Sequence, residues 1–172
     1  MSCDGVGLLP LIKELNKDTL VGAEIGCCRG GTTRYLLENL PNLYLHGIDP
    51  YEIYIDWNGT PFGQEEHMHY MLSNIDLFKD RFNFIKKSSD EASKYIKDDS
   101  LDFIFIDGLH TYEQVLIDCD NYYSKIKSGG IFAGHDYNVI EGVKNAVDKY
   151  AQKVNIDTVK LTEVDVWYWI KP

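Results

Sequence analysis

Basic residues are scarce in this sequence, which carries 17 Lys and Arg residues against 27 Asp and Glu residues and has a formal net charge of −10. Nucleic acids and anionic membrane surfaces are bound chiefly through basic side chains. Lys86 and Lys87 form the one basic pair that hints at such a patch. We therefore expect no nucleic-acid partner and no membrane partner. A small neutral or cationic ligand fits this composition better.

Long apolar runs and targeting signals are also missing. No segment approaches the roughly 18–20 uninterrupted apolar residues that cross a bilayer. The N-terminal segment lacks the basic and apolar regions of a secretory signal, and Met1 is not followed by the glycine that myristoylation requires. We expect a cytoplasmic protein. The length of 172 residues predicts a single domain over residues 1–172.

Cysteine is too sparse and too poorly spaced for a disulfide framework or a zinc site. The four cysteines are Cys3, Cys27, Cys28 and Cys119. A disulfide between the adjacent Cys27 and Cys28 would be strained, and the pair is not a C-x-x-C redox motif. No other Cys or His lies at zinc-ligand spacing from this pair. We expect four free thiols in a reducing compartment.

Apolar segments of strand length alternate with helical patterns through most of the chain. We expect strands over residues 20–25, 43–49, 81–87, 101–107 and 130–136, and helices over residues 8–16, 32–39, 63–79, 89–97, 111–127 and 140–153. Thr32 is the expected N-cap of the second helix. Ser128, Gly129 and Gly130 predict the end of the fifth helix.

The strands are nearly continuous apolar runs, which is typical of a parallel sheet covered on both faces by helices. Residues 158–172 predict two strands with a short link, and therefore an antiparallel hairpin. The expected fold class is α/β, a three-layer α/β/α sandwich around a seven-stranded, mostly parallel sheet with an antiparallel C-terminal hairpin. In such sheets ligands bind beyond the carboxyl ends of the strands.

Glycines follow the first strand, in the segment EIGCCRGG at residues 24–31. Gly26 and Gly30 allow a sharp turn and a close approach of a ligand to the backbone, and the next helix offers unpaired N–H groups to a carboxylate. The spacing is G-x-x-x-G rather than the G-x-G-x-x-G of dinucleotide-binding proteins. A plain glycine turn between a strand and a helix explains the segment equally well.

Polar side chains that could bind a nucleoside follow the second and third strands. Asp49 ends the second strand, 25 positions after Glu24, where an acid can accept hydrogen bonds from two ribose hydroxyls. The alternative for Asp49 is a turn cap before Pro50. Ser88 and Ser89 follow the third strand, where they could contact an adenine edge or cap the next helix.

Carboxylates and imidazoles follow the fourth and fifth strands. Asp107 and His110 come after one strand, and His135 and Asp136 come after the next. Because these strand ends meet at one edge of the sheet, we expect the four side chains to converge. Mixed sites of histidine and carboxylate suit Mn, Fe or Zn, whereas carboxylate oxygens alone suit Mg, Mn or Ca. A histidine that only packs in the core is the common alternative for a single residue.

A resemblance to class I S-adenosylmethionine-dependent methyltransferases is carried by EIGCCRGGTTRYL, HGID and FIFIDGLHTYEQVLIDCDNYYSKIKSGGIFAGHDY. The pattern D-G-x-H-x-Y-x-x-x-x-x-D, followed by G-G-x-x-x-x-H-D-Y, is similar to small methyltransferases related to antibiotic-sugar and catechol-type O-methyltransferases. The resemblance covers residues 20–150 and implies a Rossmann-like fold. It implies methyl transfer from S-adenosylmethionine to a small-molecule acceptor, with a hydroxyl oxygen as the favoured target.

The resemblance also implies roles for individual residues. The expected cofactor-binding residues are Glu24, Gly26, Cys27 and Gly30 around the methionine part, Asp49 at the ribose, Ser88 and Ser89 at the adenine, and Asp107. Asp107 and Asp136 match the metal-binding aspartates of metal-dependent relatives, so Mg²⁺ or another divalent metal is a second expected cofactor. Catechol-type enzymes follow the second aspartate with asparagine, but here Tyr137 precedes Asn138, which leaves the third ligand open. His110 or His135 is the expected general base.

Residues 51–80 form a long segment between two strands, which favours a substrate lid or a pocket wall. Aromatic walls suit a flat or sugar-like acceptor, and the aromatic residues here are Tyr51, Tyr54, Trp57, Phe62 and Tyr70. The alternative is a surface helix whose aromatic side chains pack against the sheet. His67 and His69 are two positions apart, so on a helix they point in different directions and make a poor metal pair.

Two other functions are compatible with part of the sequence. A non-catalytic nucleoside-binding module would keep the glycine loop and Asp49, but it has no need for the Asp and His residues downstream. An NAD-dependent oxidoreductase is disfavoured by the G-x-x-x-G spacing. The sequence is compatible with a homo-oligomer and does not name the methyl acceptor.

Overall fold

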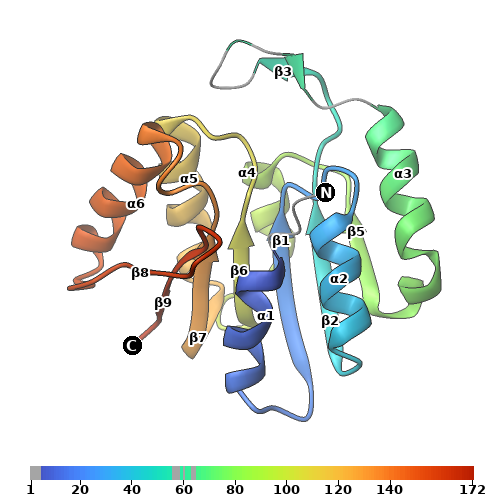
Figure 1. Cartoon of the computed structure of the whole chain (residues 1–172), viewed down its shortest axis with the longest axis horizontal. Helices are drawn as coiled ribbons and strands as arrows, with labels where there is room; N and C mark the ends of the chain where they lie inside the picture. Colours follow the sequence, from blue (N-terminus) through green and yellow to red (C-terminus); the bar gives the residue numbers. More distant parts are fainter. Residues whose placement is uncertain (1–4, 56–58, 60, 63–64) are drawn as a thin grey trace.

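A computed structural model describes residues 5–55, 59, 61–62 and 65–172. Its main sheet has seven strands in the order β5-β2-β1-β6-β7-β9-β8 (Figure 1). The strands are β1 (Leu20–Ile25), β2 (Leu43–Ile48), β5 (Phe82–Ile85), β6 (Leu101–Ile106), β7 (Ile126–Gly134), β8 (Lys160–Leu161) and β9 (Trp167–Ile170). β9 runs antiparallel to both of its neighbours, and the other pairs are parallel. The predicted sheet and its C-terminal hairpin are confirmed.

Helices cover both faces of this sheet (Figure 1). One face carries α1 (Gly5–Glu14), α2 (Gly31–Asn39) and α3 (Glu65–Ile75), and the other carries α4 (Ser89–Ala92), α5 (Tyr112–Tyr123) and α6 (Glu141–Lys153). Two 3₁₀ turns, η1 (Asp76–Arg81) and η2 (Ser93–Tyr95), follow α3 and α4. The predicted three layers are confirmed. Among the described residues, no helix combines the length and apolar character needed to span a bilayer.

The central strand β6 explains why its sequence is a continuous apolar run. Phe103 and Phe105 pack in the hydrophobic cluster beneath α1 and α2. Ile104 and Ile106 point the other way, into the cluster beneath α5 and α6. Each of these side chains is at most 4% exposed, and burial of such a side chain stabilises the fold by roughly 1.5–3 kcal/mol. The strand is therefore fixed firmly, and Asp107 follows it directly.

The start of α2 differs from the prediction. The residue before the helix is Gly30, which has a φ of 75° and makes no side-chain cap hydrogen bond. Thr32 lies inside the helix and is buried, so its prediction as the N-cap is wrong. The left-handed conformation at Gly30 starts the helix instead, because glycine adopts a positive φ without steric cost.

The end of α5 also differs from the prediction. The helix stops at Tyr123, and Gly129 and Gly130 lie within β7 rather than at a helix end. The pairing of β6 with β7 shifts register before Ile131, and Gly129 has a φ of 78° in the irregular stretch. These glycines therefore accommodate a bulge in a strand. In the sequence alone, glycines at a bulge cannot be told from glycines that end a helix.

The segment after β2 divides into two parts. The first contains the short strand pair β3 (Tyr54–Ile55) and β4 (Pro61–Phe62), which lies above the carboxyl ends of the parallel strands (Figure 1). The second part, α3, packs beside α2 and buries Met71 and Ile75 in the core. Trp57 lies outside the described residues. The lid role of residues 51–80 stays a prediction.

Asp102, near the amino end of β6, is a fully buried carboxylate. It accepts hydrogen bonds from the Lys17 and Lys127 ammonium groups at 2.7 and 2.9 Å and from the Val21 N–H at 2.8 Å. Burial favours the neutral acid, but the hydrogen bonds from Lys127, Lys17 and Val21 outweigh it and hold the pKa of Asp102 below its ordinary value. The carboxylate thus ties β1 and β7 to β6 at the sheet end opposite the predicted site.

Replacing Asp102 with Ala should lower the free energy of unfolding by about 2–4 kcal/mol, because three charge-assisted hydrogen bonds are lost. This difference in the free energy of unfolding should have its full size above a pH of about 4. It should shrink on acidification, because the wild-type carboxylate loses its stabilising contribution as it is protonated. Urea denaturation measures both effects. The control Glu38→Ala removes an exposed ion pair with Arg34 and should cost about 0.5 kcal/mol or less. Equal losses in the two variants would contradict the assignment.

Candidate functional site

The glycine loop after β1 packs closely against the end of β6. Gly26 has a φ of 90°, and a Cβ at this position would lie 1.9 Å from the carbonyl oxygen of Asp107. The Gly26 N–H donates to the Ile48 carbonyl and the Asp107 N–H donates to the Ile25 carbonyl, each at 2.9 Å. Only glycine fits Gly26, and the loop occupies the switch point where the strand order reverses between β1 and β6.

Asp49 turns its carboxylate toward this loop. Its oxygens accept hydrogen bonds from the N–H groups of Cys28 and Tyr51 at 3.0 and 2.8 Å, and the Tyr51 hydroxyl donates to the Cys28 carbonyl at 2.7 Å. Burial raises the pKa of Asp49, and these backbone hydrogen bonds offset part of the rise. Each oxygen keeps a lone pair, so the carboxylate can still accept hydroxyl groups of a ligand. Tyr51 itself is buried in the core, not part of an open wall.

The side chains of Cys27 and Glu24 are buried beneath the glycine loop. Cys27 is 3% exposed, its sulfur lies beside Gly47, and burial raises the pKa of its thiol well above the ordinary value. Glu24 is 1% exposed and accepts a hydrogen bond from Thr33 in α2. Cys27, Cys28 and Cys119 are free thiols, and Cys3 lies outside the described residues. The side chains of Cys27 and Glu24 are therefore buried beneath the loop, and their roles in cofactor binding stay predictions.

A cavity of about 200 Å³ lies beyond the strand ends, beside the glycine loop. It brings together the predicted cofactor residues Gly26, Asp49, Ser88 and Ser89. Its described lining contains four carboxylates and no Lys or Arg; the carboxylates belong to Asp49, Glu52, Asp90 and Asp118. A larger, more open hollow of about 590 Å³ between α5 and α6 contains none of the predicted residues. The smaller cavity is therefore the candidate binding site.

Ser88 and Ser89 have different roles at one side of this cavity. Ser88 caps α4 by accepting the Glu91 N–H at 3.3 Å, as its alternative interpretation proposed. Ser89 accepts a hydrogen bond from the Gln114 amide at 3.2 Å, and the same amide lies 3.0 Å from a carboxylate oxygen of Asp118. Sequence reasoning missed Gln114. Its spacing of four residues from Asp118, which places both on one face of α5, is the signal that could have found it.

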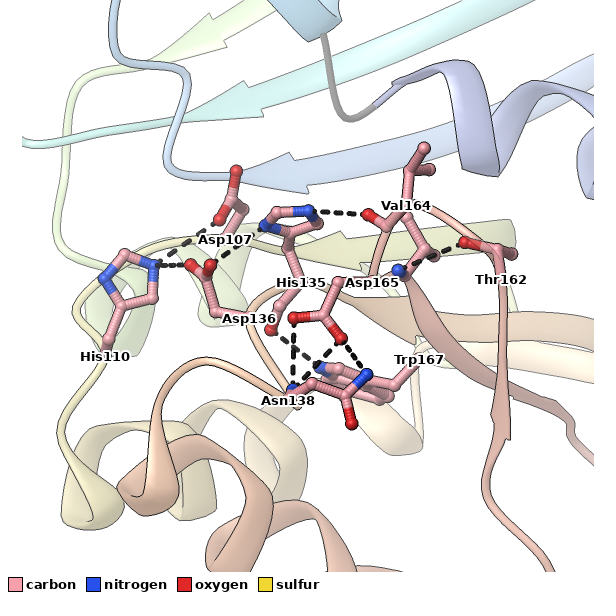
Figure 2. A network of polar contacts seen from close by, with 10 residues as sticks. Asp107, His110, His135, Asp136, Asn138, Thr162, Val164, Asp165 and Trp167 are labelled. Carbon is pink, nitrogen blue, oxygen red and sulfur yellow. Dashed lines mark hydrogen bonds and ion pairs between the residues drawn. The ribbon is translucent and has the colours of Figure 1, made fainter. Parts of the chain in front are cut away.

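Asp107, His110 and Asp136 converge at the ends of β6 and β7 (Figure 2). The Nε2 atom of His110 lies 3.4 Å from Asp107 Oδ1 and 3.0 Å from Asp136 Oδ2. Each of the three side chains is 19% exposed, so the cluster is open to solvent on one side. In the described part of the chain, one ligand atom from each residue lies within 4.8 Å of the others, a grouping that can hold a metal ion. His67 and His69 are not in this grouping.

The charges in this cluster depend on one another. Burial would lower the pKa of His110, but the hydrogen bonds and charges of Asp107 and Asp136 outweigh burial and raise it to about 10. Burial would raise the pKa of Asp136, but His110 and His135 hold it well below its ordinary value. The two carboxylates therefore favour the protonated form of His110. General-base catalysis needs the neutral imidazole, and a role of His110 as the general base stays a prediction.

His135 is held at both ring nitrogens. Nδ1 lies 3.2 Å from Asp136 Oδ1, and Nε2 lies 3.0 Å from the Val164 carbonyl oxygen (Figure 2). Both neighbours are acceptors, so the ring suits a proton on each nitrogen. The Trp167 indole N–H also donates to the His135 carbonyl at 3.1 Å. These contacts fix the Asp136 turn, and a role of His135 as a general base stays a prediction.

Asn138 points away from the carboxylate cluster (Figure 2). Its backbone N–H lies 3.0 and 3.1 Å from the two carboxylate oxygens of Asp165, and its side-chain amide donates to the same group at 2.6 Å. Asp165 belongs to the turn between β8 and β9, and nothing in the sequence pattern indicated its contact with this region. The asparagine that follows the second aspartate in catechol-type enzymes therefore has no counterpart in this cluster.

Comparison with known proteins decides the family. A family described as a methyltransferase domain matches residues 23–137, which include the glycine loop, Asp49 and both strand ends of the cluster. The chain belongs to this methyltransferase family. The family implies S-adenosylmethionine as the methyl donor. A relative, the uncharacterized protein R132 of Acanthamoeba polyphaga mimivirus, is 33% identical over 131 residues, which cover 74% of this chain and 56% of that protein. The methyltransferase chain thus spans little more than half of that relative.

Several solved structures share its fold. The O-methyltransferase NovP is 21% identical with a TM-score of 0.72, and the match covers 98% of this chain and 77% of NovP. A Staphylococcus aureus protein with a proposed caffeoyl-CoA O-methyltransferase activity is 18% identical with a TM-score of 0.72, over 100% of this chain and 84% of that protein. Rv0187 from MTB, solved with its cofactor bound, is 12% identical with a TM-score of 0.70, over 99% and 81% of the two chains. These likenesses confirm the Rossmann-like methyltransferase fold.

The buried Asp118 should make stability depend on pH. Burial raises its pKa to about 6, although hydrogen bonds with Ser89 and Gln114 oppose the rise. Because the folded chain holds this proton more tightly than the unfolded chain, the wild type should lose stability as the pH rises from about 4 to 6. The asparagine side chain in Asp118→Asn does not titrate. The free energy of unfolding of this variant, relative to that of wild type, should therefore increase by about 1–2 kcal/mol between pH 5 and pH 8.

Denaturation at the two pH values measures this change. Asp90→Asn is the matched control, because Asp90 also contacts the Gln114 amide but is exposed at the surface. The charge of Asp90 makes only a minor contribution to the raised pKa of Asp118, so the effect of Asp90→Asn on stability should change much less between the two pH values. A pH-independent effect of Asp118→Asn would mean that the buried carboxyl has an ordinary pKa in the folded protein.

Proposed function

We propose that this methyltransferase transfers the methyl group of S-adenosylmethionine to a hydroxyl oxygen of a small-molecule acceptor. The observation that carries the proposal is that residues 107–110 belong to two neighbouring sites. Gly108 and Leu109 line the acidic cavity, whereas Asp107 and His110 belong to the carboxylate cluster. A donor in the cavity and an acceptor at the cluster would therefore meet along this short segment, and alignment of this kind can contribute several kcal/mol to catalysis.

The charge of the cavity supports the choice of cofactor. S-adenosylmethionine supplies a methyl group on a positively charged sulfur. Four carboxylates among the described lining residues favour a cation, and the lack of Lys and Arg there disfavours the diphosphate of NAD. Asp49 would accept the ribose hydroxyls, and Ser89 with Gln114 would face the base. Gly26 lines the cavity without a side chain, so its backbone would be available to the methionine part.

Asp107 and Asp136 are the residues that would hold a divalent metal, because their carboxylate oxygens converge and remain partly exposed. A divalent ion at this place supplies Lewis-acid chemistry that favours the anionic form of a bound hydroxyl. His135 holds Asp136 in position through its contact with Asp136 Oδ1. A non-catalytic nucleoside-binding module would leave this cluster without a purpose. We further propose that the acceptor is neither nucleic acid nor lipid, in keeping with the acidic charge.

Isothermal titration with S-adenosylmethionine, S-adenosylhomocysteine and NAD tests the cofactor. We expect both adenosyl compounds to bind and NAD not to bind. Asp49→Ala should raise the dissociation constant for S-adenosylhomocysteine about tenfold to hundredfold, because each hydrogen bond to a charged acceptor contributes roughly 1.5–3 kcal/mol. Binding of NAD alone would refute the proposal.

Tyr51→Phe is the matched control for Asp49→Ala. It removes the hydroxyl that holds the Cys28 carbonyl but leaves the carboxylate of Asp49 in place. Its effect on the dissociation constant should be several times smaller. If the two variants weaken binding equally, Asp49 acts by ordering the loop and does not bind the ribose.

Chelation tests the metal in turnover. Conversion of S-adenosylmethionine to S-adenosylhomocysteine is followed by mass spectrometry with a panel of catechols and hydroxyl-bearing sugars as acceptors. EDTA should lower turnover of the wild type about hundredfold, and Asp136→Ala should be equally slow with and without EDTA. The surface variant Glu38→Ala should behave as wild type does. Turnover that neither EDTA nor Asp136→Ala changes would exclude a metal role.

A further inference from the structure

We propose that His110 is the third protein ligand of the metal at Asp107 and Asp136, and that this mixed donor set selects a first-row transition metal such as Mn²⁺ over Mg²⁺. The proposal rests on the metal site of the proposed function and assigns His110 a place in that site, instead of a role as the base. Three observations carry it: the spacing of the three donor atoms, the removal of Asn138 from the site, and the contacts that hold Asp136.

The spacing of the donor atoms fits ligands of one ion. Imidazole nitrogen and carboxylate oxygen bind transition metals at about 2.0–2.2 Å, so ligands at right angles or tetrahedral angles are separated by about 3.0–3.5 Å. His110 Nε2 lies 3.0 Å from the oxygen of Asp136 and 3.4 Å from the oxygen of Asp107. The same nitrogen thus faces both carboxylates at ligand separation, and the Asp-Gly-Leu-His turn brings it there from only three residues beyond Asp107.

Asn138 is not available as a third ligand. Its side-chain amide and its backbone N–H both donate to Asp165, in the turn between β8 and β9 (Figure 2). To reach the cluster, Asn138 would have to break these hydrogen bonds and expose the carboxylate of Asp165. Within the described residues, His110 is the group that joins the two aspartates at metal-binding distances.

The second carboxylate is held by contacts of the kind that orient metal ligands. Asp136 has a φ of 63°, and its Oδ1 atom lies 3.2 Å from His135 Nδ1, while Oδ2 faces His110. His135 is fixed in turn by the Val164 carbonyl, which lies 3.0 Å from Nε2. Hydrogen bonds to a coordinating carboxylate fix its orientation and commonly change metal affinity 10–100-fold. His135 therefore acts as a positioning residue, and His110 is the imidazole that coordinates.

The donor set decides which metal is preferred. Mg²⁺ binds oxygen ligands and keeps much of its water, whereas imidazole nitrogen favours Mn²⁺, Fe²⁺, Co²⁺ or Zn²⁺ over Mg²⁺. One imidazole and two carboxylates on one side of an ion resemble the three-residue sites that leave the opposite side open. All three side chains here are 19% exposed, so solvent reaches the cluster. The acceptor oxygen would have access to the metal there.

Binding of Mn²⁺ to the full chain, stripped of metal with a chelator, tests the assignment. Electron paramagnetic resonance counts the bound ions, and electron spin echo modulation detects a ¹⁴N nucleus bonded to Mn²⁺. We expect one Mn²⁺ per chain with ¹⁴N modulation, and at least about tenfold weaker competition by Mg²⁺. His110→Asn should abolish the modulation, weaken Mn²⁺ binding about tenfold or more and reduce the preference over Mg²⁺.

His135→Gln is the matched control, because it removes the other imidazole of the cluster without removing the proposed ligand. It should keep the ¹⁴N modulation. Wild-type protein containing ¹⁵N-labelled histidine gives a second test that needs no variant and should replace the ¹⁴N signal with a ¹⁵N signal. Bound Mn²⁺ without nitrogen modulation, or modulation that is lost in His135→Gln and kept in His110→Asn, would overturn the proposal.

Failure of this proposal can be told apart from failure of the proposed function. If Mn²⁺ does not bind but S-adenosylhomocysteine binds and methyl transfer proceeds in EDTA, the metal assignment is wrong and the methyltransferase activity stands. If neither adenosyl compound binds, the proposed function fails whatever the Mn²⁺ experiment shows. Circular dichroism of each variant confirms that it is folded before its binding is compared.

Discussion

The close approach of the glycine loop to β6 is the constraint on which both halves of the site depend. At Gly26 a side chain would collide with the carbonyl oxygen of Asp107, 1.9 Å from the place of its Cβ, and Asp107 in turn donates its N–H to the Ile25 carbonyl. The backbone that would receive the cofactor and the backbone that carries the first acidic side chain of the cluster therefore meet at one junction. A shift of either would move the other, so in the proposed reaction donor binding would be coupled to the geometry at the acceptor.

The carboxylates at the two ends of β6 have different surroundings. At the amino end of β6, Asp102 is neutralised by two lysines and a backbone N–H, so the carboxylate serves only stability. At the carboxyl end, Asp107 and Asp136 share one imidazole and remain partly exposed. Carboxylates that converge at a partly exposed edge can hold a cationic ligand, and this difference in exposure and partners distinguishes the proposed functional end of the sheet from the other end.

The sequence predicted those features that depend on one element at a time. β1 matches its predicted range, and the convergence of Asp107, His110 and Asp136 follows from strand ends that lie side by side in a parallel sheet. The predictions were wrong where contacts between two elements determine the local structure. The sequence around Gly129 predicts the end of a helix, but pairing of β7 with β6 makes this glycine part of a bulge. Thr32 was predicted as an N-cap, but Gly30 starts the helix from a left-handed conformation. The burial of Tyr51 beneath the loop also needs the tertiary structure.

The C-terminal hairpin shows why the site cannot be reduced to the segment that carries the family resemblance. The family match ends at residue 137, whereas Val164, Asp165 and Trp167 lie beyond it. These residues accept from or donate to the turn that carries Asp136, through His135 and Asn138. The antiparallel pairing of β9 with β7 brings them there, since it returns the chain to the end of β7 where Asp136 follows. The last strand pair therefore completes the sheet and also sets the position of the second carboxylate, which links the proposed metal site to a part of the chain outside the shared motifs.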